Sequence, residues 1–331
     1  MHEPGAQGRA GGLGVAAFLS TLKDRASTPT ALVLITFIVF LVVVGTIKPT
    51  VSTPQNMLGV LTLSSTTIIT AVGFTIAVVA GVFDLSVGSA MMLTGVIFGT
   101  LAKAGVPLII AGALTILLGT AIGVTNAILV VKLRINPIIA TLGMLFALKG
   151  AGQLIGGGRG TQVPDLAFRF ARNDVLGVPI PILIMAAVVI AGTYFLAYTP
   201  VGRRLTAVGD NSVGAREVAL DVDRFRTIAL VLCGTLAGLS GLVVASIVGA
   251  IDPQASVGRE LDIATATFLG GASLAGGRGS IPATLIAVVL LGTLYNAFVQ
   301  FGVKPEIVQV VSGALLVLAV AINTRPTGGY R

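Results

Sequence analysis

Charged side chains are rare in this sequence, and many of them fall in one central stretch, YTPVGRRLTAVGDNSVGAREVALDVDRFR, residues 198–226. The stretch contains five arginines and four acidic residues. Such a segment cannot lie in hydrocarbon, where each central charge costs several kcal/mol. It therefore forms an aqueous loop, and the chemistry open to it is helix capping and charged contact with a partner.

Helix-capping oxygens stand in the middle of this loop. Asp210, Asn211 and Ser212 offer them, and VGAREVAL after them predicts about two turns of helix within 211–220, with Ala215 and Ala219 on one face. A short, capped surface helix is a docking element in form. The alternative is a solvated basic loop that only reflects membrane topology, and the residues alone leave both interpretations open.

Two further stretches interrupt apolar runs. In VAGVFDLSVGSAMML, Asp84 and Ser86 can cap a helix that begins at Leu85; the alternative is a broken helix whose end lines a transport pathway. In FLGGASLAGGRGSIPATL, Ser280 can cap the next helix and Pro282 suits its first turn. The two glycine-rich interruptions lie at corresponding points of the two halves, which suggests an internal repeat.

Residues for bond chemistry are scarce. The only histidine is His2, the only cysteine, Cys233, lies in an apolar run, and no phosphate-binding G-x-x-x-x-G-K-[ST] occurs. We therefore expect no catalytic site, no metal site and no cofactor bound by this chain.

The elements that carry these residues are membrane spans. The chain has 331 residues, of which 55% are hydrophobic and 10% charged, and its mean hydropathy is +1.00. These values are typical of a polytopic, all-α membrane protein. About 20 apolar residues cross the hydrocarbon core. Ten segments fit, the eighth of them short and rich in Gly, Ala and Thr: 31–47, 58–80, 85–102, 107–131, 137–155, 179–198, 227–250, 261–274, 281–301 and 307–323.

Loop charges predict the orientation. With both termini inside, 13 of the Lys and Arg residues fall on the inner side and 7 on the outer side, as the positive-inside rule requires. We expect a cytoplasmic tail over 1–30, one transmembrane domain over 31–323 with a cytoplasmic loop at 199–226 and external loops at 156–178 and 251–260, and a second cytoplasmic tail over 324–331. The net charge of +8 follows from this topology and does not indicate nucleic-acid binding.

Polar side chains within or beside the spans are candidates for a translocation pathway. They could equally hydrogen-bond neighbouring helices, which is the commoner case. The candidates are Asp84, Ser86, Asn126, Asn296 and Gln300. Glycine pairs four residues apart, including Gly119 with Gly123 and Gly234 with Gly238, predict close helix packing.

The central loop resembles the coupling loop of ABC-importer permeases of the ribose/xylose/arabinose/autoinducer-2 family. That family has a G-x-N-x-x-A-A-R core, matched here at Gly209, Asn211, Ala215 and Arg216; Ala219 replaces a common glycine. Gly214, Glu217 and Val218 also depart from the usual residues. The resemblance implies that the helix docks in a cleft of an ATPase. The implied coupling residues are Gly209, Asn211, Ala215, Arg216, Glu217 and Leu220.

Both glycine interruptions and a third segment extend the resemblance. The family's G-G-I-D-L-S-V-G-S is similar to the segment around Asp84, and its G-G-x-S-L-x-G-G-x-G to residues 270–279. A third pattern agrees over 126–143, including Asn126, Pro137 and Thr141. The glycines we expect to break helices are Gly81, Gly88, Gly270, Gly271, Gly276, Gly277 and Gly279.

The resemblance implies a permease subunit of an ATP-driven importer for a monosaccharide or related polyol, in the bacterial cytoplasmic membrane. Its partners would be an ABC ATPase that binds ATP and Mg²⁺, a second permease, an extracytoplasmic sugar-binding protein and lipid. The alternative function is a self-sufficient ion-coupled carrier or channel. External charges are candidates for docking the binding protein, or are simply solvated: Arg159, Arg169, Arg172, Arg259 and Glu260.

Overall fold

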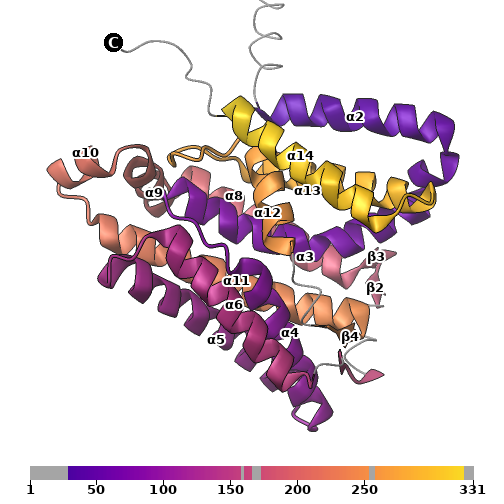
Figure 1. Cartoon of the computed structure of the whole chain (residues 1–331), viewed down its shortest axis with the longest axis horizontal. Coiled ribbons are helices and arrows are strands. Elements are labelled where there is room, and N and C mark those ends of the chain that lie inside the picture. Colours follow the sequence, from indigo (N-terminus) through magenta and orange to yellow (C-terminus); the bar gives the residue numbers. More distant parts are fainter. Residues whose placement is uncertain (1–28, 158–159, 166–172, 253–257, 324–331) are drawn as a thin grey trace, which may run out of the picture.

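The computed structural model describes residues 29–157, 160–165, 173–252 and 258–323, which form a bundle of helices (Figure 1). Both predicted tails lie almost wholly outside these ranges. Helices occupy all ten predicted segments: α2 (Pro29–Ile47), α3 (Pro54–Val79), α4 (Val87–Lys103), α5 (Leu108–Ala127), α6 (Pro137–Ile155), α8 (Ile180–Tyr198), α11 (Val222–Val248), α12 (Arg259–Leu269), α13 (Ile281–Gln300) and α14 (Pro305–Asn323). Within the described ranges, seven helices are long and apolar enough to cross a membrane. The all-α polytopic class is thus confirmed, whereas ten crossings and the orientation stay predictions.

Two helices form the centre of the bundle. In the apolar window of α3, 83% of the residues are buried, and in that of α11 61% are, against 6% in α2 at the periphery. Glycines let α11 approach α5 closely: a Cβ on Gly119 would lie 2.5 Å from the Gly234 carbonyl oxygen and 2.6 Å from the Gly238 Cα. The predicted glycine pairs therefore serve backbone-to-backbone packing.

Hydroxyl groups add links between the central helices. Ser240 on α11 donates to the Thr66 carbonyl oxygen of α3 at 2.7 Å, and the hydroxyls of Thr75 on α3 and Thr284 on α13 lie 3.2 Å apart. All four residues are buried. Without water, such groups find partners on neighbouring helices.

Several predicted segments have different limits in the structure; the second, for example, begins at Pro54, four residues early, where Thr53 caps α3. The eighth is helical only as α12, whose eleven residues span about 16 Å, half of the hydrocarbon thickness; glycines end it at Gly270. The seventh begins five residues early, because Asp221 caps α11 by accepting from the Arg224 N–H at 3.0 Å. The third begins at Val87, two residues late.

Short elements complete the fold. They are the 3-10 turn η1 (Pro49–Ser52), the π turn η2 (Ile128–Lys132), and the helices α9 (Pro200–Asp210) and α10 (Ser212–Glu217). The prediction of helices alone missed two antiparallel strand pairs, β1 (Thr161–Gln162) with β4 (Ala250–Ile251) and β2 (Asp174–Val175) with β3 (Val178–Pro179). In Figure 1, α10 lies at the left end of the bundle and β2, β3 and β4 at the right end. The helix α10 is thus far from these three strands.

Candidate functional site

The charged central stretch folds as two short helices joined at one residue. Thr199 caps α9 by accepting from the Gly202 N–H at 3.0 Å. Asn211 ends α9 in an extended conformation and caps α10, because its Oδ1 accepts from the N–H groups of Val213 and Gly214 at 3.1 and 2.9 Å. Of the three capping candidates, Asn211 is the one that the structure uses.

The second helix is shorter than predicted. It ends at Glu217, and the Leu220 and Ala219 N–H groups then donate to the carbonyl oxygens of Ala215 and Arg216, both at 3.0 Å. This closing pattern needs a left-handed residue, and Ala219 supplies it with φ of 58°. Ala215 and Ala219 therefore do not share a helical face. A glycine would suit this left-handed conformation better than alanine.

One surface of α10 is open to a partner. Val213 and Val218 are 69% and 71% exposed, Arg216 and Glu217 are exposed as well, and Val213, Arg216 and Glu217 border a surface hollow. Arginine is enriched at protein contacts, whose centres are apolar and whose rims are polar. The two valines were missed in the sequence, because hydropathy alone does not distinguish a surface valine from a buried one.

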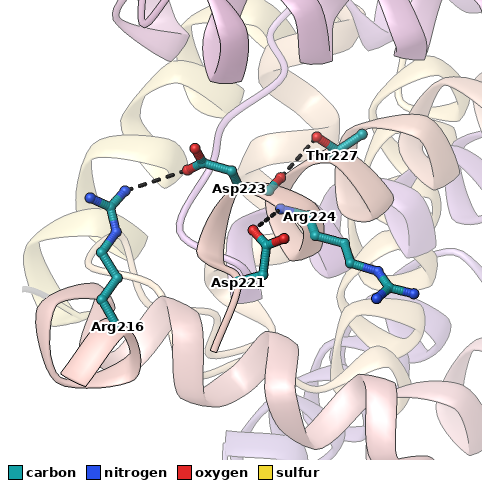
Figure 2. A network of polar contacts seen from close by, with 5 residues as sticks. All are labelled: Arg216, Asp221, Asp223, Arg224 and Thr227. Carbon is teal, nitrogen blue, oxygen red and sulfur yellow. Dashed lines mark hydrogen bonds and ion pairs between the residues drawn. The ribbon is translucent and has the colours of Figure 1, made fainter. Parts of the chain in front are cut away.

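An ion pair ties α10 to the start of α11. Figure 2 shows the Arg216 side chain directed at Asp223, with the guanidinium nitrogen and the carboxylate oxygen 3.4 Å apart. The two side chains are 61% and 50% exposed. The Arg224 side chain points away from this pair (Figure 2). Arg216 is thus in contact with its own chain, yet most of it remains accessible.

The six predicted coupling residues divide into two groups. Asn211, Arg216 and Glu217 are exposed. Gly209 and Ala215 are buried, and Leu220 packs on the main hydrophobic core. The buried residues and Leu220 therefore pack within this chain, whereas the three exposed residues are accessible to a partner.

The two glycine-rich interruptions have the same backbone pattern. After α3, Gly81 is left-handed with φ of 74° and the Val82 N–H donates to the Ala77 carbonyl oxygen at 3.0 Å. After α12, Gly271 has φ of 87° and the Ala272 N–H donates to the Thr267 carbonyl oxygen at 3.1 Å. Both helices therefore end in the same glycine-dependent motif.

Both interruptions continue into a helix cap or turn. Ser280 caps α13 as predicted, accepting from the Ala283 N–H at 3.3 Å. The prediction that Asp84 and Ser86 cap a helix at Leu85 is wrong in its geometry. Asp84 accepts from the Ser86 N–H at 2.9 Å in a turn before α4, and Ser86 makes no side-chain cap bond.

Asp84, Ser86 and Asn126 form one buried cluster. The Asn126 Nδ2 donates to the Asp84 carboxylate at 3.0 Å and to the Ser86 hydroxyl at 2.9 Å, and the Ser86 hydroxyl donates to Asp84. All three are at most 1% exposed. Within the described ranges, the Asn126 Oδ1 and the nearby Ser89 hydroxyl have no hydrogen-bond partner. The cluster therefore retains unused hydrogen-bonding capacity.

The other two pathway candidates lie at the opposite end of α3. Asn296 and Gln300 on α13 meet Asn56: the Asn56 Nδ2 donates to the Asn296 Oδ1 at 2.9 Å, and the Gln300 Nε2 donates to the Asn56 Oδ1 at 3.1 Å. Thr50 donates to the Gln300 Oε1 at 2.6 Å. These side chains tie α13 to η1 and α3. Their role in a pathway stays a prediction.

The candidates for external docking are placed only in part. Arg159, Arg169 and Arg172 lie outside the described residues. Arg259 and Glu260 are half-buried, and a Cβ on Gly88 would lie 2.8 Å from the Glu260 carboxylate. Arg259 and Glu260 pack on the first turn of α4. Thr161 of β1 packs on Gly99, three turns farther along the same helix. Arg259 and Glu260 therefore lie about three helical turns away from β1 along α4.

The chain matches the family model described as "Branched-chain amino acid transport system / permease component" over residues 56–320. It is 35% identical over 297 residues to the ribose import permease protein RbsC of Escherichia coli K12, which covers 88% of this chain and 92% of that protein. It is 33% identical over 259 residues to the autoinducer 2 import system permease protein LsrD of Yersinia enterocolitica, covering 76% of this chain and 78% of that protein. No solved structure matches it.

Proposed function

We propose, on the premise that this chain belongs to the family of branched-chain amino acid transport system permease components, that it is the membrane-spanning subunit of an ATP-driven importer for a monosaccharide or a related small polyol. Relatives named for ribose and autoinducer 2 import cover most of its length, which supports the substrate class. Within that family it is a multi-pass protein of the bacterial inner membrane.

The observation that carries the proposal is the form of α10. It is a six-residue helix with a capped start, a closed end and exposed Val213, Arg216 and Glu217, at one end of the bundle (Figure 1). An ATPase subunit would bind this helix. Since Leu205 and Val208 of α9 are fully buried, a force on α10 would reach the bundle through α9.

The membrane part would alternate between outward and inward openings. The buried cluster of Asp84, Ser86 and Asn126 lies between α3, α4 and α5. Its unused oxygen atoms suit hydroxyl groups of a sugar, which donate to such acceptors. A second permease, identical or homologous, and an extracytoplasmic binding protein would complete the importer.

The experiment that tests the proposal is energisation of uptake. The complex is purified from native membranes through a tag on this chain, its partners are identified by mass spectrometry, and it is reconstituted in vesicles. We expect an ABC ATPase to copurify, and uptake of radiolabelled ribose or xylose to require ATP inside an importer-oriented vesicle. Uptake that follows a proton or sodium gradient without ATP would instead establish the alternative, an ion-coupled carrier.

A further inference from the structure

Four glycines bring three separated parts of the chain into backbone contact. Gly209 is the last residue but one of α9, Gly81 follows α3, and Gly276 and Gly277 lie between α12 and α13. The Gly277 N–H donates to the carbonyl oxygen of Val79, the last residue of α3, at 3.0 Å. The interruptions after α3 and α12 are thus hydrogen-bonded to each other directly.

Gly209 fits against this hydrogen bond. A Cβ at Gly209 would lie 1.8 Å from the Val79 carbonyl oxygen and 2.7 Å from the Gly277 nitrogen. A Cβ at Gly276 would lie 2.7 Å from the Gly209 carbonyl oxygen and 3.0 Å from the Gly81 Cα. At Gly277 it would lie 2.6 Å from the Asp210 Cα. No side chain is tolerated at these three positions without a displacement, so the backbones of the three segments are in close contact.

Each segment leads on to a different part of the molecule. Asp210 is followed by Asn211, the cap of α10. Gly81 is three residues before Asp84, which is hydrogen-bonded to Asn126 of α5. Gly277 is three residues before Ser280, the cap of α13. The three segments that meet at Gly209 thus continue into α10, into the turn before α4 and into α13.

We propose that Gly81, Gly209, Gly276 and Gly277, here called the glycine joint, are positioning residues that transmit the movement of α9 and α10 to both helix interruptions together. This inference rests on the proposed coupling of α10 to an ATPase. Its rival is a hinge at the extended residue Asn211, which would let α10 move while α9 and the interruptions stay still.

Distances between spin labels distinguish the joint from the hinge. Three accessible residues are replaced by Cys and spin-labelled two at a time: Ala207 on α9, Ala275 between α12 and α13, and Lys132 in η2. The native Cys233 is fully buried and does not compete for the label. The complex with its copurified ATPase is compared without nucleotide and after trapping with ATP, Mg²⁺ and vanadate. We expect the 132–207 and 132–275 distances to change between the two states, and the 207–275 distance to stay constant.

The other outcomes overturn the proposal. If residue 207 moves without residue 275, or if neither moves in a complex that hydrolyses ATP, the joint does not transmit the motion. If no ATPase copurifies, the proposed function itself fails, and the joint is overturned with it because it then has nothing to transmit.

A glycine pair gives a matched mutational test. Gly277 and Gly302 have φ of 72° and 71°, but nothing among the described residues lies within 4 Å of a Cβ at Gly302. Both Gly277→Ala and Gly302→Ala add the same backbone strain, and only the first adds a clash. We expect Gly277→Ala to keep ATPase copurification and to lower sugar uptake per ATP hydrolysed, because the added methyl group displaces Asp210 from its contact with Gly277. Gly302→Ala should retain the uptake per ATP of the unchanged protein. Equal uptake per ATP in the two variants would overturn the proposal, and so would a Gly277→Ala protein that loses uptake only in proportion to its folded amount.

Discussion

Reversing the charge of Arg216 separates docking from folding. In the structure its guanidinium lies 3.4 Å from Asp223, with both side chains at least half exposed. An exposed ion pair contributes about 0.2–1 kcal/mol to stability. The substitution Arg216→Glu replaces this attraction by repulsion between two exposed carboxylates, and it therefore costs the fold only about 1 kcal/mol.

The same substitution is far more costly at a protein contact. Charge reversal there costs several kcal/mol, and about 3 kcal/mol weakens association roughly 100-fold. We therefore expect Arg216→Glu to express and to remain stable in detergent near the level of the unchanged protein. ATPase copurification, measured by pull-down, and ATP-dependent sugar uptake should both collapse.

Two matched variants isolate the cause. Asp223→Asn removes the ion pair and leaves Arg216 unchanged, so docking should persist. Arg224→Glu makes the same charge change on a residue whose side chain points away from the ion pair (Figure 2), so its defect should be smaller. Normal transport by Arg216→Glu, loss through misfolding, or equal loss in either control would refute the reasoning.

The remaining predictions concern the ends of α10 and the topology. Asn211→Ala removes the acceptor for two N–H groups and should cost α10 about 1 kcal/mol, giving a milder uptake defect than Arg216→Glu with normal expression; an unchanged rate of amide exchange in α10 would contradict this. Ala219→Gly should relieve the left-handed alanine and slow exchange of the same amides, by a net gain of about 0.5–1 kcal/mol; faster exchange would show that the strain is absent. Reporters fused after Arg134 and Arg226 should score cytoplasmic and one within 156–177 external, and an external score after Arg226 would exclude docking to a cytoplasmic ATPase.

Much of the fold was predictable because membrane helices obey a local rule. A run of about 20 apolar residues must satisfy its own backbone hydrogen bonds in lipid, so hydropathy locates it without knowledge of its neighbours. The helix α6 (Pro137–Ile155) has the predicted limits, and Asn136 caps it with Pro137 at its start. Capping is equally local, which is why Asn211 and Ser280 were recognisable as candidates.

Where local chemistry offers several solutions, the sequence left the choice open. Asp84 could cap a helix or line a pathway, and its actual bonds go to Ser86 and to Asn126, 42 residues away. Leu220 resembled a docking residue, but it packs on this chain's own core. Such outcomes depend on which segments meet, and that depends on packing across the whole bundle.

The sequence by itself determined the membrane class, most of the helical segments, the charged central loop and two of the glycines that end helices, Gly81 and Gly271. Gly88, which was also expected to break a helix, lies within the first turn of α4. Only the tertiary structure decided what those glycines are for. Gly81, Gly209 and Gly277 lie far apart in sequence, yet their backbones are in contact. A glycine indicates that a side chain is missing, but which atom occupies that space is determined by long-range packing, which no local pattern contains.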